Sequence, residues 1–271
     1  MEYSVLMSVY FKETAGNLKS AIDSMINQTA TTNDFVLVCD GDLTEELNSV
    51  INEFVKKYPD IFNIIRIPKN PSWAEVLNIG LNACKNELVA RMDSDDISPL
   101  DRCKKQFDFL KEHTDVDCVS TSIGEFSDDY NNINYVRKLP ATNEEIKEFA
   151  KYRCPLNHAT VIYKKSAVLK SGGYHHFPAY EDYHLWVRMI KAGCVLYNMP
   201  DVLYYMRAGE NLYARRGGLK YFKTMRNFRI WMHHEKMVGF FKTHYLIIAN
   251  GIVILMPNGL RGLIYKKFLR K

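Results

Sequence analysis

Strand-like and helix-like segments alternate through the first hundred residues, and this alternation limits the possible folds more than any other feature. Short apolar runs at 4–10, 35–39, 63–67 and 88–92 are typical of buried strands, and the segments at 17–28, 45–58 and 72–83 have helical spacing. Such alternation forms βαβ units with a mostly parallel central sheet flanked by helices, so we predict an α/β fold. Ligands bind beyond the carboxyl ends of the strands in these sheets, so residues 10–11, 40–41 and 93–96 are expected at one edge.

The rest of the chain has a mixed pattern that ends in a basic tail. Helices are predicted over 100–112 and 182–192, and strands over 118–123, 160–163 and 202–205. Beyond residue 207 the pattern is basic and helical, and no internal repeat or low-complexity linker precedes it. We predict one domain with a C-terminal extension.

Composition and charge narrow the class of protein. A chain of 271 residues can bury a sizeable core without disulfide or metal staples. Its six cysteines form no CxxC pair and no zinc-ligand spacing, which indicates reduced thiols in a cytosolic protein, and no signal-peptide pattern is expected. The net charge of +5 is uneven, since residues 236–271 contain seven Lys or Arg and no Asp or Glu. This basic end predicts an anionic partner, either lipid headgroups or nucleic acid.

Acidic residues follow two of the predicted strands. Asp93, Asp95 and Asp96 come directly after the strand at 88–92, and carboxylates so close together repel unless a cation or hydrogen-bond donors lie among them. Hard oxygen ligands suit Mg²⁺ or Mn²⁺ holding a diphosphate, whereas an Asp-rich turn that caps the next helix is the alternative. Asp40 precedes Gly41 after another strand, where it could accept hydrogen bonds from a base or sugar or simply form a common Asp-Gly turn.

Three further groups could contribute to chemistry. Glu181 and Asp182 open a predicted helix, where the helix dipole favours acidic residues and where a carboxylate could also deprotonate a hydroxyl nucleophile. His158 stands alone, and a lone histidine is more often structural than a ligand. Three arginines near a Gly-Gly pair could clamp diphosphate oxygens or form a solvated basic face: Arg207, Arg215 and Arg216.

Taken in order, these segments resemble an inverting nucleotide-sugar glycosyltransferase of family 2, which has the GT-A fold. The resemblance covers essentially the whole chain and includes LNIGL at 77–81 and ARMDSDD at 90–96. Its end is similar to a bacterial capsular and exopolysaccharide subgroup, the amylovoran-biosynthesis-like enzymes. Cys39 departs from the pattern, because it replaces the first Asp of the family's VDDG segment. The other matching stretches are 4–10, 21–28, 36–41, 157–161, 172–174, 181–186 and 215–221.

The resemblance implies a role for each candidate residue. Asp95 would be the direct ligand of Mn²⁺ or Mg²⁺, and Asp93 would hold ribose or the metal. Asp182, or else Glu181, would be the base that activates the acceptor, and His158 would lie near the donor sugar or the acceptor. The residues implied to bind the nucleotide are Ser8, Tyr10, Asp40, Arg91 and Asp93, and those implied to close over the diphosphate are Arg207, Arg215 and Arg216.

The resemblance also implies a domain organisation and a reaction. Residues 1–206 would form the GT-A catalytic domain, with the nucleotide in 1–100 and the acceptor in 101–206, and 207–271 would be a helical basic extension. A sugar would pass with inversion from a nucleotide-diphosphate donor, a UDP-hexose before dTDP-rhamnose, to a lipid-diphosphate-linked acceptor in bacterial cell-surface polysaccharide synthesis.

The C-terminal segment predicts where this reaction takes place. The apolar run at 245–256 is too short to span a bilayer. Together with the basic segment at 260–271 it predicts an interfacial helix on an anionic leaflet, at the cytoplasmic face of the cell membrane. The alternative is a helix that packs on the domain and has a solvated basic end.

Two other functions are compatible with parts of the sequence. A nucleotidyltransferase also joins a parallel sheet to metal-binding carboxylates, but it usually carries a glycine-rich loop after the first strand, and here no glycine occurs before Gly16. A non-catalytic nucleotide-binding or nucleic-acid-binding protein would use the basic tail. Because no aromatic-basic stacking platform occurs outside that tail, no nucleic-acid partner is expected.

Overall fold

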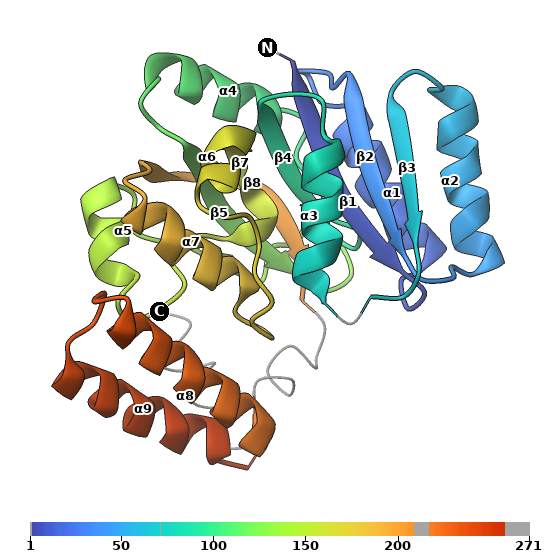
Figure 1. Ribbon diagram of the computed structural model, residues 1–271. Coiled ribbons are helices and arrows are strands. Elements are labelled where there is room, and N and C mark those ends of the chain that lie inside the picture. The colour runs from blue at the N-terminus through green and yellow to red at the C-terminus, as the bar shows by residue number, and fades with distance from the viewer. Residues whose placement is uncertain (1, 71, 209–216, 258–271) are drawn as a thin grey trace.

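Within residues 2–70, 72–208 and 217–257, which the computed structural model describes, eight strands form one central sheet. Helices cover both of its faces, and a helical hairpin lies beside it (Figure 1). Each face of the sheet has its own cluster of buried apolar side chains. The predicted α/β architecture is confirmed.

Four parallel strands form the first half of the sheet. They are β1 (Tyr3–Tyr10), β2 (Asp34–Asp40), β3 (Phe62–Ile67) and β4 (Leu88–Asp93). β1 is central, because it pairs with β2 on one side and with β4 on the other, and β3 pairs with β2. Each strand lies within one residue of its predicted bounds.

The helices that follow these strands begin and end close to the predicted residues. They are α1 (Ala15–Ile26), α2 (Glu45–Lys57), α3 (Trp73–Ala83) and α4 (Arg102–Glu112). Thr14 and Thr44 cap the first two, since their hydroxyls accept hydrogen bonds from backbone N–H groups in the first turn. Gly80 lets α3 lie close against the sheet, because a Cβ there would collide with Leu6 and Val38.

The second half of the sheet is mixed rather than parallel. β7 joins β4 to β5 by antiparallel pairing, β6 also pairs antiparallel with β5, and β8 runs parallel to β5. Thr160 was expected in a strand, but it ends a short 3₁₀ turn because its hydroxyl bonds the Asn157 carbonyl. The elements here are β5 (Cys118–Phe126), β6 (Tyr135–Arg137), α5 (Asn143–Phe149), β7 (Ile162–Lys164), α6 (Lys165–Lys170), α7 (Glu181–Lys191) and β8 (Leu196–Arg207).

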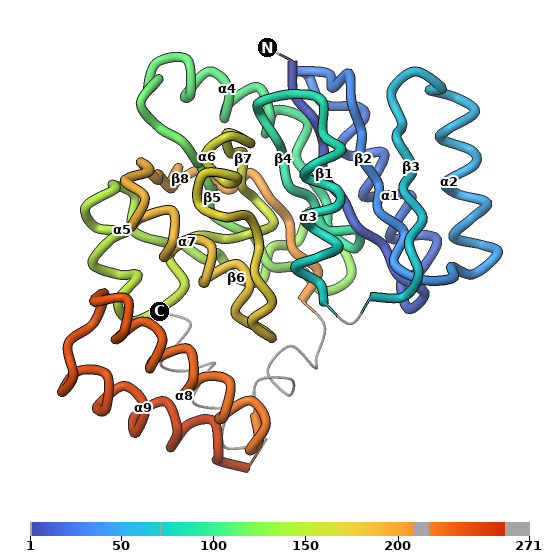
Figure 2. Tube along the Cα trace, in the orientation of Figure 1, coloured from blue at the N-terminus to red at the C-terminus, as the bar shows by residue number. Residues whose placement is uncertain are grey.

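The C-terminal helices α8 (Gly218–His234) and α9 (Phe240–Leu255) form an antiparallel hairpin beside α7 (Figure 2). A third apolar cluster joins α7 to both, with Val187, Phe228 and Leu246 as members. Across the described ranges, no helix combines the length and the apolar character that crossing a membrane requires. Arg215, Arg216 and the basic segment at 260–271 lie outside the described residues.

Candidate active site

A cleft of about 600 Å³ opens at the carboxyl ends of β1, β2 and β4. The register brings these ends together, since Tyr10 pairs with Asp40 and Ser8 pairs with Asp93. The predicted meeting of these segments at one sheet edge is thus confirmed. Six of the residues selected from the sequence line the cleft: Ser8, Tyr10, Asp40, Arg91, Asp93 and Asp95.

The three carboxylates of the acidic loop after β4, residues 93–96, have different surroundings. Asp96 is buried, and its Oδ1 accepts a 2.7 Å hydrogen bond from the backbone N–H of Arg207, which anchors the loop to the end of β8. Asp93 is held by the buried guanidinium of Arg91, whose Nη2 donates to its Oδ1 at 2.6 Å. Asp95 lines the cleft without either restraint, and it is the carboxylate best placed for a ligand.

The electrostatics at Asp95 suit a bound cation. Burial and the charges of Asp93 and Glu13 raise the pKa of Asp95 to about 6. A divalent cation would relieve this repulsion. In the described ranges, no three His, Cys, Asp or Glu side chains are grouped to hold a metal ion. Mg²⁺ is commonly held by one or two carboxylates together with substrate phosphates and water, so Asp95 and Asp93 fit a metal that arrives with a diphosphate.

The wall formed by β1 and β2 presents groups suited to a nucleotide. The ring of Tyr10 is 44% exposed, which leaves a face open for stacking. Asp40 lines the cleft while its Oδ1 accepts a 2.7 Å hydrogen bond from the backbone N–H of Asn70. Cys39 is fully buried in the apolar core on one side of the sheet, so this departure from the family pattern does not reach the cleft.

Trp73, the first residue of α3, forms another wall that the sequence analysis missed. Its indole is 38% exposed, its ring lies edge-on to the His158 ring at 5.3 Å, and the Arg91 guanidinium lies 5.7 Å from its centroid. His158 itself is buried, and its Nε2 and the Tyr174 hydroxyl are 2.9 Å apart. Burial and the Arg91 charge lower the pKa of His158 well below its usual value, so the imidazole is neutral. His158 thus supports Trp73 from behind rather than lining the cleft.

The two acidic residues at the start of α7 differ in accessibility. Glu181 is 7% exposed, and burial raises its pKa. Asp182 is half-buried in the first helical turn, and the Cys154 thiol donates to its Oδ2 at 3.5 Å. Neither residue lines the 600 Å³ cleft.

The loop before α7 nevertheless adjoins the cleft. His176 Nδ1 lies 3.1 Å from the hydroxyl of Ser72, which immediately precedes Trp73. The pKa of Tyr174 is raised mainly by burial and slightly by the charge of Asp182, so this carboxylate lies near the partner of His158. The loop before α7 thus reaches the part of the cleft wall that begins with Trp73.

Arg207 ends β8 beside the acidic loop. Its Nε donates to the Asp95 carbonyl at 3.1 Å, and its guanidinium lies 4.8 Å from the Phe126 ring centroid. Its positive charge also partly offsets the raised pKa of Asp95. Among the three predicted diphosphate arginines, it is the one whose position the structure describes, and it lies at the acidic loop.

Sequence reasoning missed other cleft residues besides Trp73. Lys12, Glu13 and Asn17 line the cleft directly after β1, and Glu13 Oε1 accepts from the Asn17 side chain at 3.0 Å. The rule that ligands bind beyond the carboxyl ends of strands would have found Lys12 and Glu13. For Trp73, the signal was a large aromatic at the start of a helix on the same edge.

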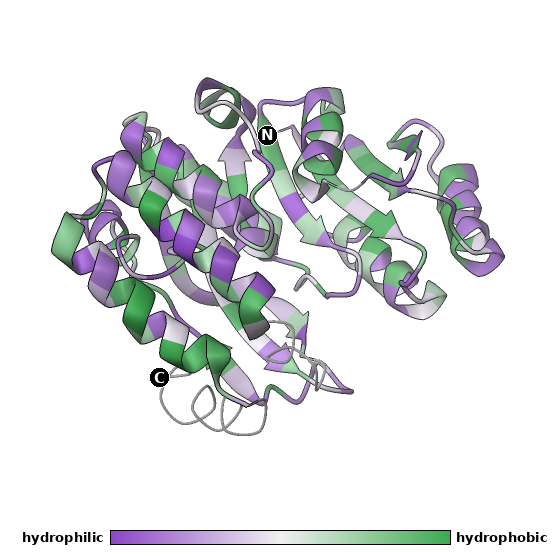
Figure 3. Ribbon diagram, turned by 60° about the horizontal axis from the view of Figure 1, so that its bottom comes forward, coloured by the Kyte–Doolittle hydropathy of each residue, from purple (hydrophilic) through white to green (hydrophobic). Residues whose placement is uncertain are grey.

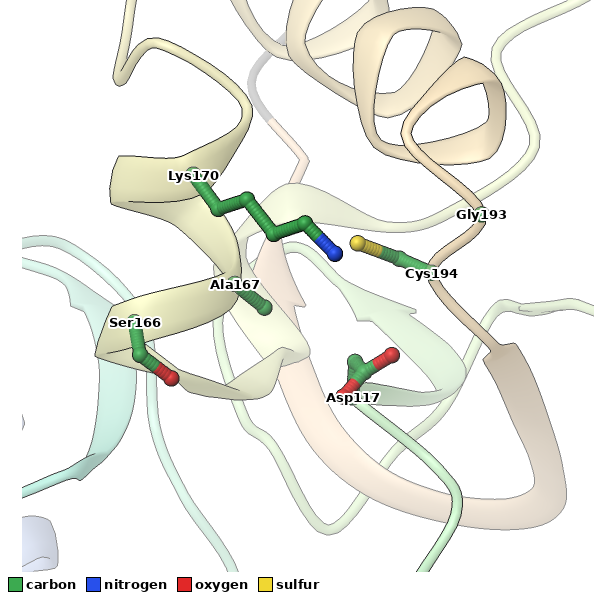
Figure 4. A pocket seen from close by; sticks show the side chains of 6 residues that line it. All are labelled: Asp117, Ser166, Ala167, Lys170, Gly193 and Cys194. Atoms are coloured by element: carbon green, nitrogen blue, oxygen red, sulfur yellow. The ribbon is translucent and has the colours of Figure 1, made fainter.

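A second cavity lies at the opposite edge of the sheet. Its volume is about 360 Å³, and it lies beside the amino ends of β5 and β8. Figure 4 shows the Lys170 ammonium directed toward the Cys194 sulfur. Asp117 is already engaged, since it pairs with Lys164 at 3.1 Å and accepts from the backbone N–H of Val195. This cavity contains none of the residues selected from the sequence.

Comparison with known protein families gives a direct assignment. The family model for glycosyl transferase family 2 matches residues 4–176, which include both the cleft and the acidic loop. The chain belongs to glycosyl transferase family 2. It is a glycosyltransferase with the GT-A fold, as the resemblance implied.

Three bacterial glycosyltransferases match the chain over nearly their whole length. An uncharacterized glycosyltransferase of Haemophilus influenzae is 36% identical over 100% of both chains. The amylovoran biosynthesis glycosyltransferase AmsE of Erwinia amylovora is 33% identical over 98% of both. A UDP-Gal:alpha-D-GlcNAc-diphosphoundecaprenol beta-1,3-galactosyltransferase of Escherichia coli is 34% identical over 100% of this chain and 97% of its own.

Solved structures of other glycosyltransferases share the fold. A mannosyltransferase from Pyrobaculum calidifontis, in complex with GDP-Man and Mn²⁺, superposes with a TM-score of 0.66 at 16% identity, over 98% of this chain and 75% of its own. TarS 1–349 from S. aureus, in complex with UDP-GlcNAc, gives 0.64 at 16% identity, over 85% and 66%. These structural neighbours thus include complexes with nucleotide sugars and with a divalent metal.

Proposed function

We propose that this glycosyltransferase moves a hexose from a UDP-linked donor to a lipid-diphosphate-linked sugar, with inversion at the anomeric carbon. The observation that carries the proposal is the convergence of an exposed aromatic ring, Asp40 and an acidic loop in one cleft. The 34% identity to an enzyme named for UDP-Gal and a diphosphoundecaprenol-linked acceptor supports the same substrate classes.

The donor's nucleotide binds against β1 and β2. Tyr10 stacks on the base, because its exposed ring lines the cleft at the carboxyl end of β1. Asp40 accepts from the N3–H of uracil, a group that cytosine lacks and thymine shares. Ser8 and Arg91 complete this pocket, and Arg91 also holds Asp93 in position.

The diphosphate binds at the acidic loop. Asp95 and Asp93 would hold Mn²⁺ or Mg²⁺, which when bound neutralises the charge that develops on the departing diphosphate. Arg207 lies beside this loop with a permanent positive charge, and we assign the same task to it and to Arg215 and Arg216.

The acceptor is activated from the start of α7. Asp182 takes the proton of the acceptor hydroxyl as the hydroxyl oxygen bonds to the anomeric carbon and the bond to the diphosphate oxygen breaks. The N-terminus of α7 stabilises its ionised form, and its partial exposure favours it over the buried Glu181. His158 acts as a positioning residue, because its ring packs edge-on against Trp73 in the wall of the cleft.

We assign 1–206 to the catalytic domain, with the donor in 1–100 and the acceptor in 101–206, and we place the reaction at the inner face of a bacterial cell membrane. The product would be an intermediate of a capsular or exopolysaccharide. The match to an amylovoran biosynthesis enzyme supports this setting.

Donor binding and transfer can be tested separately. UDP should stabilise the wild-type protein against heat in the presence of Mn²⁺, more than GDP or CDP do, and Asp95→Asn should lose the metal-dependent part. Stabilisation by dTDP alone would contradict the UDP-hexose assignment.

Transfer is then measured with UDP-galactose and a polyprenyl-diphosphate-linked GlcNAc. Asp182→Asn should retain UDP binding and lose transfer by about 10²–10⁴-fold, with Glu181→Gln as the matched control. Near-normal transfer by Asp182→Asn would refute the base assignment. A product that retains the α configuration would refute the inverting mechanism.

A further inference from the structure

Helix α9 is apolar on both of its long faces, but only one face is covered. Thr243, Leu246, Gly251 and Ile254 are buried in the hairpin. Figure 3 shows green, hydrophobic segments at several places along α9, at the outside of the molecule. A helix that is apolar all round is normally buried on all sides. We call its exposed side chains the outer stripe: Phe241, Tyr245, Ile248, Ile252 and Leu255, which are 87%, 68%, 64%, 57% and 48% exposed.

The outer stripe forms a continuous line along the helix. Its members recur at alternating intervals of four and three residues, which keeps them on one side of an α-helix. The nearby Lys242 does not interrupt it, because its ammonium lies 3.8 Å from the Tyr152 ring centroid, toward the body of the protein. The stripe is therefore an uninterrupted apolar surface in need of a partner.

Helix α9 is too short to cover the stripe with lipid by crossing a bilayer. Sixteen residues span about 24 Å, whereas the hydrocarbon core of a bilayer is about 30 Å thick. The stripe can instead lie in the plane of the interface, as apolar helix faces do when basic residues accompany them.

The positive charge of the hairpin and of the sequence after it favours an anionic lipid surface over a second copy of the chain as the partner of the stripe. The hairpin segment 217–257 contains six Lys or Arg and one Glu, and the sequence after it, 258–271, adds five Lys or Arg and no acidic residue. Two copies joined through α9 would bring these like charges together. An anionic leaflet would attract them, since each basic residue near such a surface contributes about 1 kcal/mol.

The position of the hairpin relates the stripe to the candidate base. Tyr180, two residues before Asp182, has its ring 5.9 Å from that of Tyr221 in the first turn of α8. Phe222, the next residue, packs against α9 at Gly251, where a Cβ would lie 2.7 Å from its ring. Packed helix axes lie about 8–10 Å apart, so the stripe and Asp182 are separated by on the order of 20 Å.

We propose that the outer stripe of α9 is the membrane-docking surface of this enzyme, inserted at the headgroup boundary of an anionic leaflet. The proposal deepens, and rests on, the proposed use of a lipid-linked acceptor. It gives the site a fixed height above the bilayer, so that the base lies near a sugar attached to a membrane-borne diphosphate.

Liposome co-sedimentation of the full chain tests the proposal. Wild-type protein should bind phosphatidylglycerol-containing vesicles, bind neutral phosphatidylcholine vesicles weakly, and dissociate at high salt. The double variant Phe241→Ser, Ile248→Ser should lower the partition coefficient by at least about tenfold. The matched control is Leu100→Ser, Leu169→Ser, which removes two exposed apolar side chains elsewhere and should bind as wild type.

Two further measurements keep the outcomes distinct. Transfer to a soluble short-chain acceptor should be unchanged in the double variant, which shows that it is folded. Unchanged vesicle binding by the double variant overturns the proposal. The proposal is also overturned if the wild-type protein is a dimer and the double variant is a monomer that still binds vesicles, because the stripe would then contact a second copy of the chain. Stripe-dependent vesicle binding without transfer to any lipid-linked acceptor would instead refute the proposed function alone.

Discussion

Asn78 joins α3 to the turn before α7 through a reciprocal pair of hydrogen bonds. Its Nδ2 donates to the Tyr174 carbonyl at 2.7 Å, and its Oδ1 accepts from the Tyr174 backbone N–H at 2.8 Å. Because Tyr174 is 2% exposed, Asn78→Ala would leave both backbone groups buried without their partner. Each such loss costs about 1–3 kcal/mol, and Asn78 is itself partly accessible to water, so we expect a total of about 2–4 kcal/mol.

This loss can be converted to a melting temperature. Unfolding entropy scales with chain length at about 2.1 cal/mol/K per residue, so for 271 residues 1 kcal/mol corresponds to roughly 1.8 °C. Asn78→Ala should therefore lower the Tm by about 4–7 °C in differential scanning calorimetry. Asn78→Asp keeps the acceptor and loses the donor, so it should fall between Asn78→Ala and wild type.

The control for this prediction lies on the same helix. Asn82 is exposed, so Asn82→Ala changes the same residue type without leaving a buried backbone group, and its Tm should stay near that of wild type. If Asn78→Ala melts within about 1 °C of Asn82→Ala, the reciprocal pair contributes nothing and the reasoning is refuted.

Further predictions concern the cleft and its supports. Gly80→Ala forces a methyl group into the contact between α3 and the sheet, and it should cost about 1–3 kcal/mol in urea unfolding, whereas an unchanged midpoint would contradict that packing. Since the pKa of Asp95 is about 6, its carboxylate gains a proton as the pH falls, and affinity for Mn²⁺ alone should drop about tenfold from pH 7 to pH 5 by calorimetry. Glu13→Gln removes a neighbouring negative charge and should move this midpoint to lower pH, so an unmoved midpoint would contradict the cause given. Trp73→Ala should weaken UDP-sugar binding by about tenfold, and Trp73→Phe should bind with an affinity between that of Trp73→Ala and that of wild type. If both variants bind the UDP-sugar as tightly as wild type, the indole does not contact the donor.

The sequence predicts the first half of the molecule almost completely, for physical reasons. Its strands are continuous buried runs, and its helices begin at threonine caps such as Thr14 and Thr44, so local signals and the final packing agree. The helix predicted from residue 100 begins instead at Arg102, because the Leu100 carbonyl accepts from the Thr29 backbone N–H and leaves the helical path.

The second half is less predictable because its elements are short or set by distant contacts. β6, α5 and α6 have three to seven residues, too few for a periodic pattern. Their positions depend on partners far away in sequence, as when Asn143 Oδ1 accepts from the backbone N–H of Leu196. The local sequence around each residue does not indicate such long-range contacts.

In the candidate site, too, some residues can be predicted from the sequence and others cannot. Residues at strand ends, such as Tyr10, Asp40 and Asp95, follow from the topology of a parallel sheet. Trp73 was missed because its importance depends on His158 and Arg91, which reach it from other elements. The Asp-rich motif alone could not reveal that Asp96 anchors a strand while Asp95 faces the cleft.

The attachment of the acidic loop to β8 has a consequence for the entropy of donor binding. Beyond the anchoring of Asp96, Ile97 forms a bridge with Tyr205, and the Tyr204 hydroxyl accepts from the backbone N–H of Asp93. A loop fastened at successive points is already ordered before the nucleotide arrives, so little conformational freedom remains to be lost on binding. Residues of β8 that never touch the donor therefore help to set its affinity by fixing the shape of the loop in advance.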